Sequence, residues 1–373
     1  MHIFGARDCL FVTGGGTAGH IYAGISIADR WRELNPRSEI HFVGARGGME
    51  ERLVARTQYP LHLMPMGAWN GMSWLRRIKT AFQIPWSSSL AALWLLRKRP
   101  RAVVGVGGYA SFPLVLAAAF TGWLWGCRVA ILEQNVLPGL TNRVLGRFAR
   151  RVFAAFPGAE SVFGAQKVMV TGNPIRSSMK RLPPASGKPF TIFVFGGSQG
   201  AVGINTLVVE ALPALKASGL PIRIIHQTGE RDHERVSRAY QAHGPVDGSG
   251  FEIRVEKFIY EMLEAYGQAD VLVCRAGSST LAEIAAVGRA AILIPLVSRD
   301  RHQVYNAEYF ARAGAARMLM QGEVTGDGLA KSLIDLAKKP EELRSIEQKV
   351  TTFSMPDAVS RIVADLSPAG GQA

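Results

Sequence analysis

The sequence predicts an α/β protein built from two Rossmann-like domains, each with a parallel sheet covered by helices. Three observations support this fold class. The chain has 373 residues, more than one ordinary core accommodates. Short apolar runs alternate with helical patterns, as in parallel sheets. The order of strand, glycine-rich turn and helix occurs near residue 10 and again near residue 190, which indicates a tandem of similar folds.

Apolar runs predict seven strands in the first half of the chain and six in the second. The first set comprises residues 9–13, 39–44, 61–66, 102–107, 128–134, 151–156 and 167–172. The second set comprises residues 190–195, 222–229, 251–258, 269–277, 290–296 and 316–320. Beyond about residue 330 the pattern is helical.

A linker is predicted at 173–189, "NPIRSSMKRLPPASGKP", which is rich in Pro, Ser and basic residues and has no apolar periodicity. We therefore predict an N-terminal domain over 1–175 and a C-terminal domain over 176–352. A last helix at about 353–366 is expected to pack back on the first domain.

Composition points to an anionic partner in a reducing compartment. The formal net charge is +14, but neither zinc-finger spacing nor an RNP-type aromatic strand occurs, so nucleic acid is not expected. Cys9, Cys127 and Cys274 each lie in an apolar run, which indicates core thiols. No signal-peptide pattern precedes them, and we expect the protein to stay in the cytoplasm.

The segment 72–101 combines tryptophans with basic residues. Trp74, Trp86 and Trp94 lie among Arg76, Arg77, Lys79, Arg97, Lys98, Arg99 and Arg101. This mixture favours the plane of an anionic membrane, and Trp123 and Trp125 would extend the same patch. The alternative is a core helix with a solvated basic end. The longest apolar stretches, 87–96 and 112–126, are shorter than the roughly 20 residues of a membrane-spanning helix.

The first glycine loop fits G-x-G-x-x-G through Gly14, Gly16 and Gly19. A dinucleotide site also needs an acidic residue at the end of the second strand, but that strand ends in Gly-Ala-Arg at 44–46. NAD is therefore disfavoured. Neither glycine loop ends in Gly-Lys-Ser/Thr, which excludes a P-loop.

Two further loops are candidate ligand sites. The loop 196–200 offers backbone N–H groups, the Ser198 hydroxyl and a helix N-terminus to an anion, or it is only a tight turn. In the third loop, Thr280 and Glu283 have the T-x-x-E spacing of a capping box. The spacing favours a cap over the alternative, a carboxylate that binds ribose hydroxyls. No D-x-D, H-x-H or C-x-x-C occurs, so no metal is predicted, and a cation such as Arg176 would stabilise a departing diphosphate.

Taken together, the motifs resemble those of the bacterial MurG enzymes. The resemblance runs through nearly the whole chain: "GGTAGH" (15–20), "GVGGYAS" (105–111), "LEQNVLPGLTNR" (132–143), "FPGA" (156–159), "TGNPIR" (171–176), "FGGSQGA" (195–201), "HQTG" (226–229), "FIYEM" (258–262), "CRAGSSTLAEIAAVG" (274–288) and "DRHQVYNA" (300–307). It implies a glycosyltransferase B fold whose two domains face each other across a cleft. It also implies transfer of N-acetylglucosamine from UDP-GlcNAc to undecaprenyl-diphosphate-linked N-acetylmuramoyl pentapeptide, without a cofactor, at the cytoplasmic side of the inner membrane.

The resemblance also assigns roles to residues. Ile259 would meet the uracil through its backbone, Glu283 the ribose, and Gln303 the sugar hydroxyls. Ser198 and Arg176 would lie at the diphosphate. The helix N-terminus that binds the donor would comprise Ser278, Ser279, Thr280, Leu281 and Ala282, and the N-terminal domain would add Thr17, Ala18, Gly19 and Asn135. His20 would be the general base, although an imidazole there can also merely orient the loop.

Other functions remain possible at this point. A diacylglycerol glycosyltransferase shares the fold and a basic surface, but "GGYAS" and "EQN" argue against it. A sugar-nucleotide epimerase would need no membrane patch. An NAD-dependent oxidoreductase lacks the required acid, and a membrane-bound scaffold would leave the glycine loops unexplained.

Overall fold

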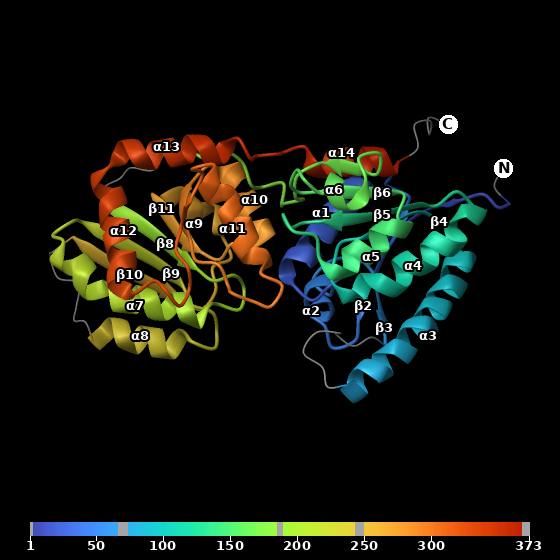
Figure 1. The fold of residues 1–373 in the computed structure, drawn as a ribbon, viewed down its shortest axis with the longest axis horizontal. Coiled ribbons are helices and arrows are strands. Elements are labelled where there is room, and N and C mark those ends of the chain that lie inside the picture. Colours follow the sequence, from blue (N-terminus) through green and yellow to red (C-terminus); the bar gives the residue numbers. More distant parts are fainter. Residues whose placement is uncertain (1–2, 66–73, 185–188, 243–249, 368–373) are drawn as a thin grey trace. The chain divides into compact units, whose positions relative to one another are not determined.

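The structure, a computed structural model, describes residues 3–65, 74–184, 189–242 and 250–367, with only the backbone over 74–82. The chain divides into two compact units (Figure 1). The first unit comprises Met1–Ser177 together with Met355–Ala373, and the second comprises Ser178–Ser354. Each unit has its own sheet and its own core.

The first unit contains a parallel seven-stranded sheet in the order β3-β2-β1-β4-β5-β6-β7. The strands are β1 (Arg7–Thr13), β2 (Glu39–Ala45), β3 (Leu61–Met64), β4 (Pro100–Gly105), β5 (Arg128–Glu133), β6 (Arg151–Ala154) and β7 (Val168–Val170). All seven coincide with predicted apolar runs, which confirms that part of the prediction. The first strands are buried on both faces, as expected for a parallel sheet between helices.

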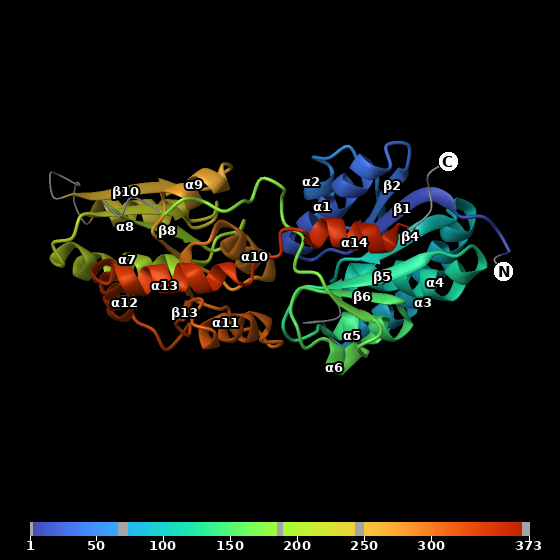
Figure 2. The ribbon, with the colours of Figure 1, turned by 90° about the horizontal axis from the view of Figure 1, so that it is seen from above.

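Helices cover both faces of this sheet (Figure 2). On one face, α1 (Ala18–Leu34) and α14 (Ala358–Leu366) share a core that includes Trp31 and Ile362. On the other, α3 (Trp74–Lys98) packs beside α4 (Phe112–Thr121) around Leu95 and Leu114. The remaining helical segments are α2 (Glu50–Val54), α5 (Leu140–Phe148), α6 (Glu160–Phe163) and the short 3₁₀ turns Tyr109–Ser111 and Gly122–Leu124.

The second unit repeats this plan with six parallel strands in the order β10-β9-β8-β11-β12-β13. They are β8 (Phe190–Phe195), β9 (Ile222–Gln227), β10 (Phe251–Glu256), β11 (Val271–Cys274), β12 (Ala290–Leu293) and β13 (Arg317–Met318). The helices are α7 (Val202–Ala217), α8 (His233–Ala242), α9 (Met262–Gln268), α10 (Ser278–Val287), α11 (His302–Arg312), α12 (Gly326–Lys338) and α13 (Pro340–Thr351). All six predicted strands are present.

The tryptophan-bearing segment forms α3, but its tryptophans do not share one environment. Trp86 is 63% exposed, whereas Trp94 packs edge-on against His62 with ring centroids 4.1 Å apart. The side chains of Trp74, Arg76, Arg77 and Lys79 lie outside the described residues. The expectation that Trp94 faces a membrane is therefore wrong, because this ring fixes α3 to the sheet.

Trp123 and Trp125 also differ. Trp123 is 63% exposed, while Trp125 is 2% exposed and donates its indole N–H to the Pro100 carbonyl at 2.9 Å. Trp125 is a core residue, so its predicted place in the surface patch is wrong. The three cysteines are buried and unpaired by disulfides, as predicted. Within the described part of the chain, no helix has the length and apolar character needed to span a bilayer.

Candidate active site

The glycine loop of the first unit lies where the strand order reverses. β1 and β4 are neighbours in the sheet, although β2 and β3 separate them in sequence. Loops that follow such a pair form the crevice in which α/β proteins bind ligands. Here the Gly15 N–H donates to the Gly107 carbonyl at 3.2 Å. Gly14, Gly107 and Gly108 all have positive φ, and a Cβ at Gly14 would lie 2.6 Å from the Gly107 oxygen. Glycine therefore permits the close approach of the two loops.

His20 lies in the first turn of α1, directly after the glycine loop. Thr17 caps the helix, and its hydroxyl accepts the His20 backbone N–H at 3.3 Å. The His20 Nδ1 is 2.9 Å from the Gly15 carbonyl oxygen, which can only accept a hydrogen bond. The neutral ring therefore carries its proton on Nδ1 and its lone pair on Nε2. This tautomer is the one that a general base acting through Nε2 requires.

Gly107 leaves room for that imidazole. A Cβ at this position would lie 2.9 Å from His20 Nε2, and the backbone φ of 108° is unfavourable for any other residue. Ala18 and Gly19 precede His20 in the same helical turn. The structure thus places Thr17, Ala18, Gly19 and His20 at the start of α1, next to the loop that contains Gly107.

The loop after β5 is organised by Glu133, a residue that sequence analysis did not single out. Its carboxylate is 2% exposed and accepts the backbone N–H groups of Asn135 and Gly139 at 2.9 and 3.0 Å. It also accepts the side-chain amides of Asn135 and Asn142 at 3.3 and 2.9 Å. Four donors on one buried carboxylate hold Asn135 in place at the carboxyl edge of the sheet.

Arg176 belongs to the first unit, although the predicted boundary assigned it to the second domain. Its guanidinium lies over the Tyr22 ring of α1, with 4.6 Å between the guanidinium carbon and the ring centroid. A guanidinium that stacks on an aromatic ring does not use its N–H donors in that contact. Arg176 is therefore held beside the helix that carries His20.

In the second unit the strand order reverses between β8 and β11. The loop after β8 contains Gly197 and Gly200, both with positive φ, and leads into α7. A Cβ at Gly200 would overlap the Thr228 carbonyl of the loop after β9. Ser198 is exposed at the tip of the loop. The glycine loop is thus packed against its neighbour, with Ser198 directed to solvent.

Gln227 links two of the predicted donor contacts. This side chain is 3% exposed, and its amide donates to the Gly197 carbonyl at 3.1 Å. Its Oε1 accepts the Ile259 backbone N–H at 2.8 Å. Because the Ile259 N–H already donates to Gln227, a uracil ring bound there would contact the Ile259 backbone carbonyl instead. Gln227 belongs to the motif "HQTG" (226–229), but the motif did not reveal its role, since its partners are backbone groups distant in sequence.

The loop after Gln227 is fixed by a buried polar network. Asn205 is fully buried and donates to the Thr228 carbonyl at 3.0 Å and to Asp232 at 2.7 Å. Its Oδ1 lies 3.0 Å from His226 Nε2, and Tyr240 lies 2.6 Å from His226 Nδ1. Burial lowers the pKa of His226 to about 3, so the ring is neutral and donates to Asn205 while accepting from Tyr240.

The capping-box prediction for Thr280 and Glu283 is wrong. The N-cap of α10 is Gly277, and no side chain caps this helix. Thr280 is the third helical residue, so Glu283 lies in the second turn, where it cannot reach an N-cap amide. Instead, a Glu283 oxygen accepts the Tyr266 hydroxyl at 3.0 Å. Ser278, Ser279 and Thr280 form the first turn of α10, and Leu281 and Ala282 follow in the same helix.

Gln303 and Arg275 lie at the same carboxyl edge. Gln303 is the second residue of α11, and its Oε1 accepts the Leu296 N–H at 3.0 Å, which shapes the loop after β12. Arg275 follows β11 and donates to the Ile294 carbonyl at 2.9 Å. Burial lowers the pKa of Arg275. Sequence analysis overlooked this arginine, although it immediately precedes the third loop.

Among the described residues, one group of three potential metal ligands, Cys9, Glu39 and His41, has its donor atoms within 4.8 Å of one another. These residues lie in the first halves of β1 and β2, away from the glycine loop at the carboxyl ends. Lys98 pairs with Glu39 at 2.7 Å, and burial raises the pKa of Cys9 to about 12. Both effects oppose metal binding there.

The two units match the two halves of one glycosyltransferase family. Residues 10–154 match the family 28 N-terminal domain, and residues 191–362 match the family 28 C-terminal domain. A protein of Citrifermentans bemidjiense is 41% identical over 360 residues, which is 95% of this chain and 98% of the relative. Its name is UDP-N-acetylglucosamine--N-acetylmuramyl-(pentapeptide) pyrophosphoryl-undecaprenol N-acetylglucosamine transferase. The chain belongs to the MurG family.

Other MurG proteins agree with this assignment. A relative of the same name from Myxococcus xanthus is 41% identical over 357 residues, covering 95% of this chain and 91% of the relative. The crystal structure of Acinetobacter baumannii MurG superposes with a TM-score of 0.77 at 29% identity, covering 96% and 99% of the two chains. The predicted MurG resemblance and glycosyltransferase B fold are thus confirmed, and the chain is a glycosyltransferase.

The same fold occurs in enzymes with another chemistry. A UDP-GlcNAc 2-epimerase from Neisseria meningitidis superposes with a TM-score of 0.62 over 96% of this chain and 99% of the epimerase. The two sequences are only 13% identical. This likeness extends to the fold alone, and membership of the MurG family decides against an epimerase.

Proposed function

We propose that this enzyme transfers N-acetylglucosamine from UDP-GlcNAc to the 4-hydroxyl of undecaprenyl-diphosphate-linked N-acetylmuramoyl pentapeptide, with inversion at the sugar C1. The proposal extends the activity named for its relatives to this chain. One observation of the structure carries it. The Nδ1–H of His20 is donated to the Gly15 carbonyl, so the lone pair of the neutral ring is on Nε2, the nitrogen that lies next to Gly107.

The second unit would bind the donor. The Ile259 carbonyl would accept a uracil N–H, and the Glu283 carboxylate would accept the ribose hydroxyls. The diphosphate would lie against Ser198 and the N-terminal turn of α10, since the positive end of a helix dipole favours an anion. Gln303 would meet the sugar hydroxyls.

The first unit would bind the acceptor and activate it. His20 Nε2 would take the proton of the attacking 4-hydroxyl as the new C1–O bond forms and the bond from C1 to UDP breaks. The departing UDP keeps the electron pair, and the charge it acquires would be stabilised by Arg176 and by N–H groups. Thr17, Ala18, Gly19 and Asn135 would complete this site.

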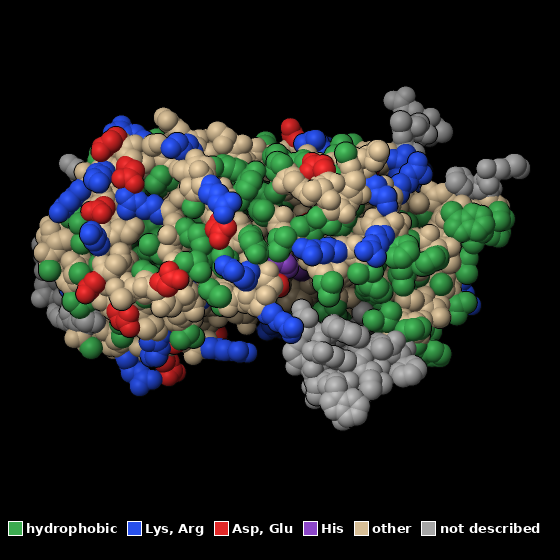
Figure 3. Space-filling view, in the orientation of Figure 1, with side chains coloured by type: hydrophobic (Ala, Val, Ile, Leu, Met, Phe, Trp, Pro, Cys, Tyr) green, Lys and Arg blue, Asp and Glu red, His purple; other side chains and the backbone are tan. Residues whose placement is uncertain are grey.

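We further propose that the enzyme binds the cytoplasmic face of the inner membrane through anionic lipids. Trp86, Leu90 and Leu93 are 63%, 41% and 63% exposed, and their spacing of four and three residues places them on one face of α3. A row of exposed apolar side chains on a protein with a net charge of +14 suits an anionic interface. Figure 3 shows further hydrophobic side chains gathered over α4 and α5, with basic residues beside them.

Vesicle binding tests this part of the proposal. Replacing Trp86 and Leu93 with serine should weaken sedimentation with phosphatidylglycerol vesicles by about tenfold or more, because both apolar side chains are lost from the interface. The matched control exchanges Leu34, which is 51% exposed on α1, for serine. Equal sedimentation of the wild type and the α3 variant would contradict the proposal.

A further inference from the structure

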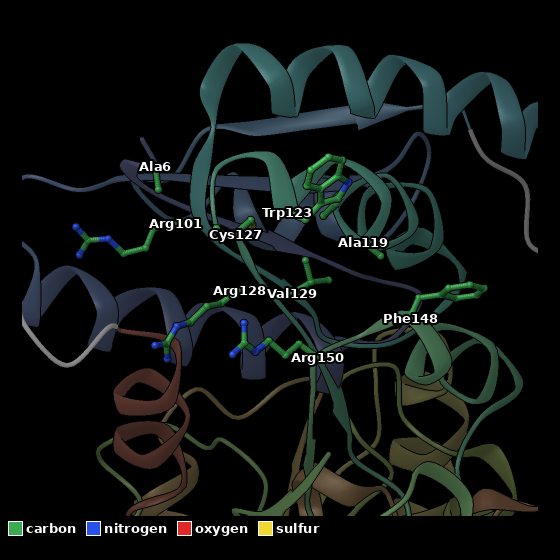
Figure 4. Close-up of a pocket in the computed structure, with 11 residues that line it drawn as sticks. Ala6, Arg101, Ala119, Trp123, Cys127, Arg128, Val129, Phe148 and Arg150 are labelled. Carbon is green, nitrogen blue, oxygen red and sulfur yellow. The ribbon is translucent and has the colours of Figure 1, made fainter. Parts of the chain in front are cut away.

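A cavity of about 560 Å³ opens in the first unit, and no residue of the glycine loop lines it (Figure 4). Arg101, Arg128 and Arg150 line it, together with the rings of Trp123 and Phe148. The other lining residues are Ala6, Ala118, Ala119, Gly126, Cys127 and Val129. Its volume is in the range of small-ligand sites.

The arginines meet because of the strand register. Arg101 is the second residue of β4, Arg128 is the first residue of β5, and Arg150 directly precedes β6. These three strands are parallel neighbours, so their amino ends share one edge of the sheet. The active-site loops follow the opposite, carboxyl ends. The cavity is therefore not part of the proposed catalytic site.

Some of the arginines at this edge of the sheet contact acidic residues, and others do not. Arg128 donates to the Asp365 carbonyl at the end of α14, and the neighbouring Arg151 pairs with the Asp365 carboxylate at 2.9 Å. Arg101 is 3.8 Å from Asp8. The Arg150 side chain has no acidic partner within 4 Å among the described residues, and none of the cavity's eleven lining residues is acidic. The cavity thus has unneutralised guanidinium groups, which favour an anion.

The opposite end of the cavity is apolar. Figure 4 shows Arg128 and Arg150 extending side by side, while Trp123 and Phe148 lie on the other side of the cavity. Trp123 is 63% exposed and Phe148 is 45% exposed. The ring of Phe120, itself 61% exposed, lies 5.5 Å from that of Phe148 and extends this aromatic surface. A ligand that fills the site would carry a phosphate at one end and an apolar group at the other.

We propose that this cavity binds the headgroup phosphate of an anionic phospholipid. Arg150 and Arg101 would bind the phosphodiester, and Trp123 and Phe148 would contact the first atoms of the acyl chains. A soluble phosphate compound shares the phosphate chemistry but would leave the exposed apolar surface of Trp123 and Phe148 in water. The inference rests on the proposed membrane association, which it deepens by naming a headgroup site.

The test uses the full chain and monomeric dihexanoyl-phosphatidylglycerol, with binding measured by calorimetry. The double variant R101Q/R150Q should bind this lipid about tenfold more weakly or worse, since two charge-assisted contacts are lost. The matched control R37Q/R56Q removes two exposed arginines elsewhere in the same unit and should bind like the wild type. The single variant R150Q, which removes no ion pair among the described residues, should show part of the loss and guards against misfolding.

Several results would overturn the inference. Equal binding by R101Q/R150Q and the wild type, or an absence of saturable binding, would reject the site. Inorganic phosphate or dihexanoyl-phosphatidylcholine binding as tightly as phosphatidylglycerol would reject an anionic lipid as its occupant. Sedimentation of the wild type with phosphatidylglycerol vesicles separates the proposals. If the wild type fails to sediment, membrane association itself is wrong, whereas sedimentation without monomer binding rejects the headgroup site alone.

Discussion

Replacing Gln227 with methionine tests how the donor loops are held. Methionine has nearly the same shape as glutamine but no amide, so the variant loses the bonds to the Gly197 carbonyl and the Ile259 N–H. Each lost bond costs ~1 kcal/mol, and the Ile259 N–H, on a residue only 4% exposed, adds ~1–2 kcal/mol when left unsatisfied. We therefore expect the free energy of unfolding of the second unit to fall by ~3–4 kcal/mol.

The donor should also bind more weakly, since the glycine loop and the Ile259 carbonyl lose their common support. We expect KM for UDP-GlcNAc to rise more than kcat falls. Urea unfolding and steady-state kinetics measure the two effects. The control Gln241→Met makes the same exchange at an exposed position of α8. If Gln227→Met matches this control in stability and donor KM, the reasoning about the loop support is refuted.

Three further predictions concern the catalytic base, its surroundings and pH. His20→Asn keeps a donor for the Gly15 carbonyl but removes the base, so kcat should fall by about 10²–10⁴ while UDP binding by calorimetry is unchanged; a kcat near wild type would exclude His20 as the base. Gly107→Ala introduces a Cβ 2.9 Å from His20 Nε2 at a φ of 108°, and we expect a loss of activity that the matched change Gly47→Ala, also at positive φ but in open space, does not cause. Burial lowers the pKa of His226 to about 3, so as pH falls below ~6.5 this histidine takes up a proton in the unfolded chain before it does so in the folded protein. Unfolding curves should therefore show that the free energy of unfolding decreases from pH ~6.5 towards pH 3. His226→Gln should flatten this pH dependence, and an unchanged slope would contradict the prediction.

Periodicity predicted the sheets well because their strands are buried on both faces. The run 271–274 is entirely apolar, and Thr191 is the one polar residue in 190–195, so few other structures would accommodate these runs. The glycine loops after β1 and β8 were also recognisable, since positive φ and close backbone contact restrict these positions to glycine.

The roles of buried polar side chains were not predictable in the same way. Glu133 and Gln227 lie in quoted motifs, but a motif does not show that Glu133 accepts several donors of the loop that follows it or that Gln227 accepts the N–H of the distant Ile259. Thr280 and Glu283 matched a capping box, but α10 begins at Ser278, and spacing alone does not locate the first helical residue. Trp94 and Trp125 are chemically suited to an interface, yet both pack inward, because composition does not tell which face of a segment is buried.

The most direct test of the central claim is UDP release from UDP-GlcNAc by the purified enzyme in EDTA, with and without a short-chain analogue of the lipid-linked muramoyl pentapeptide. The account predicts release that depends on the acceptor, persists in EDTA and is lost in His20→Asn. Release without the acceptor would indicate a hydrolase or an epimerase. A verified acceptor that causes no release would contradict the proposed reaction.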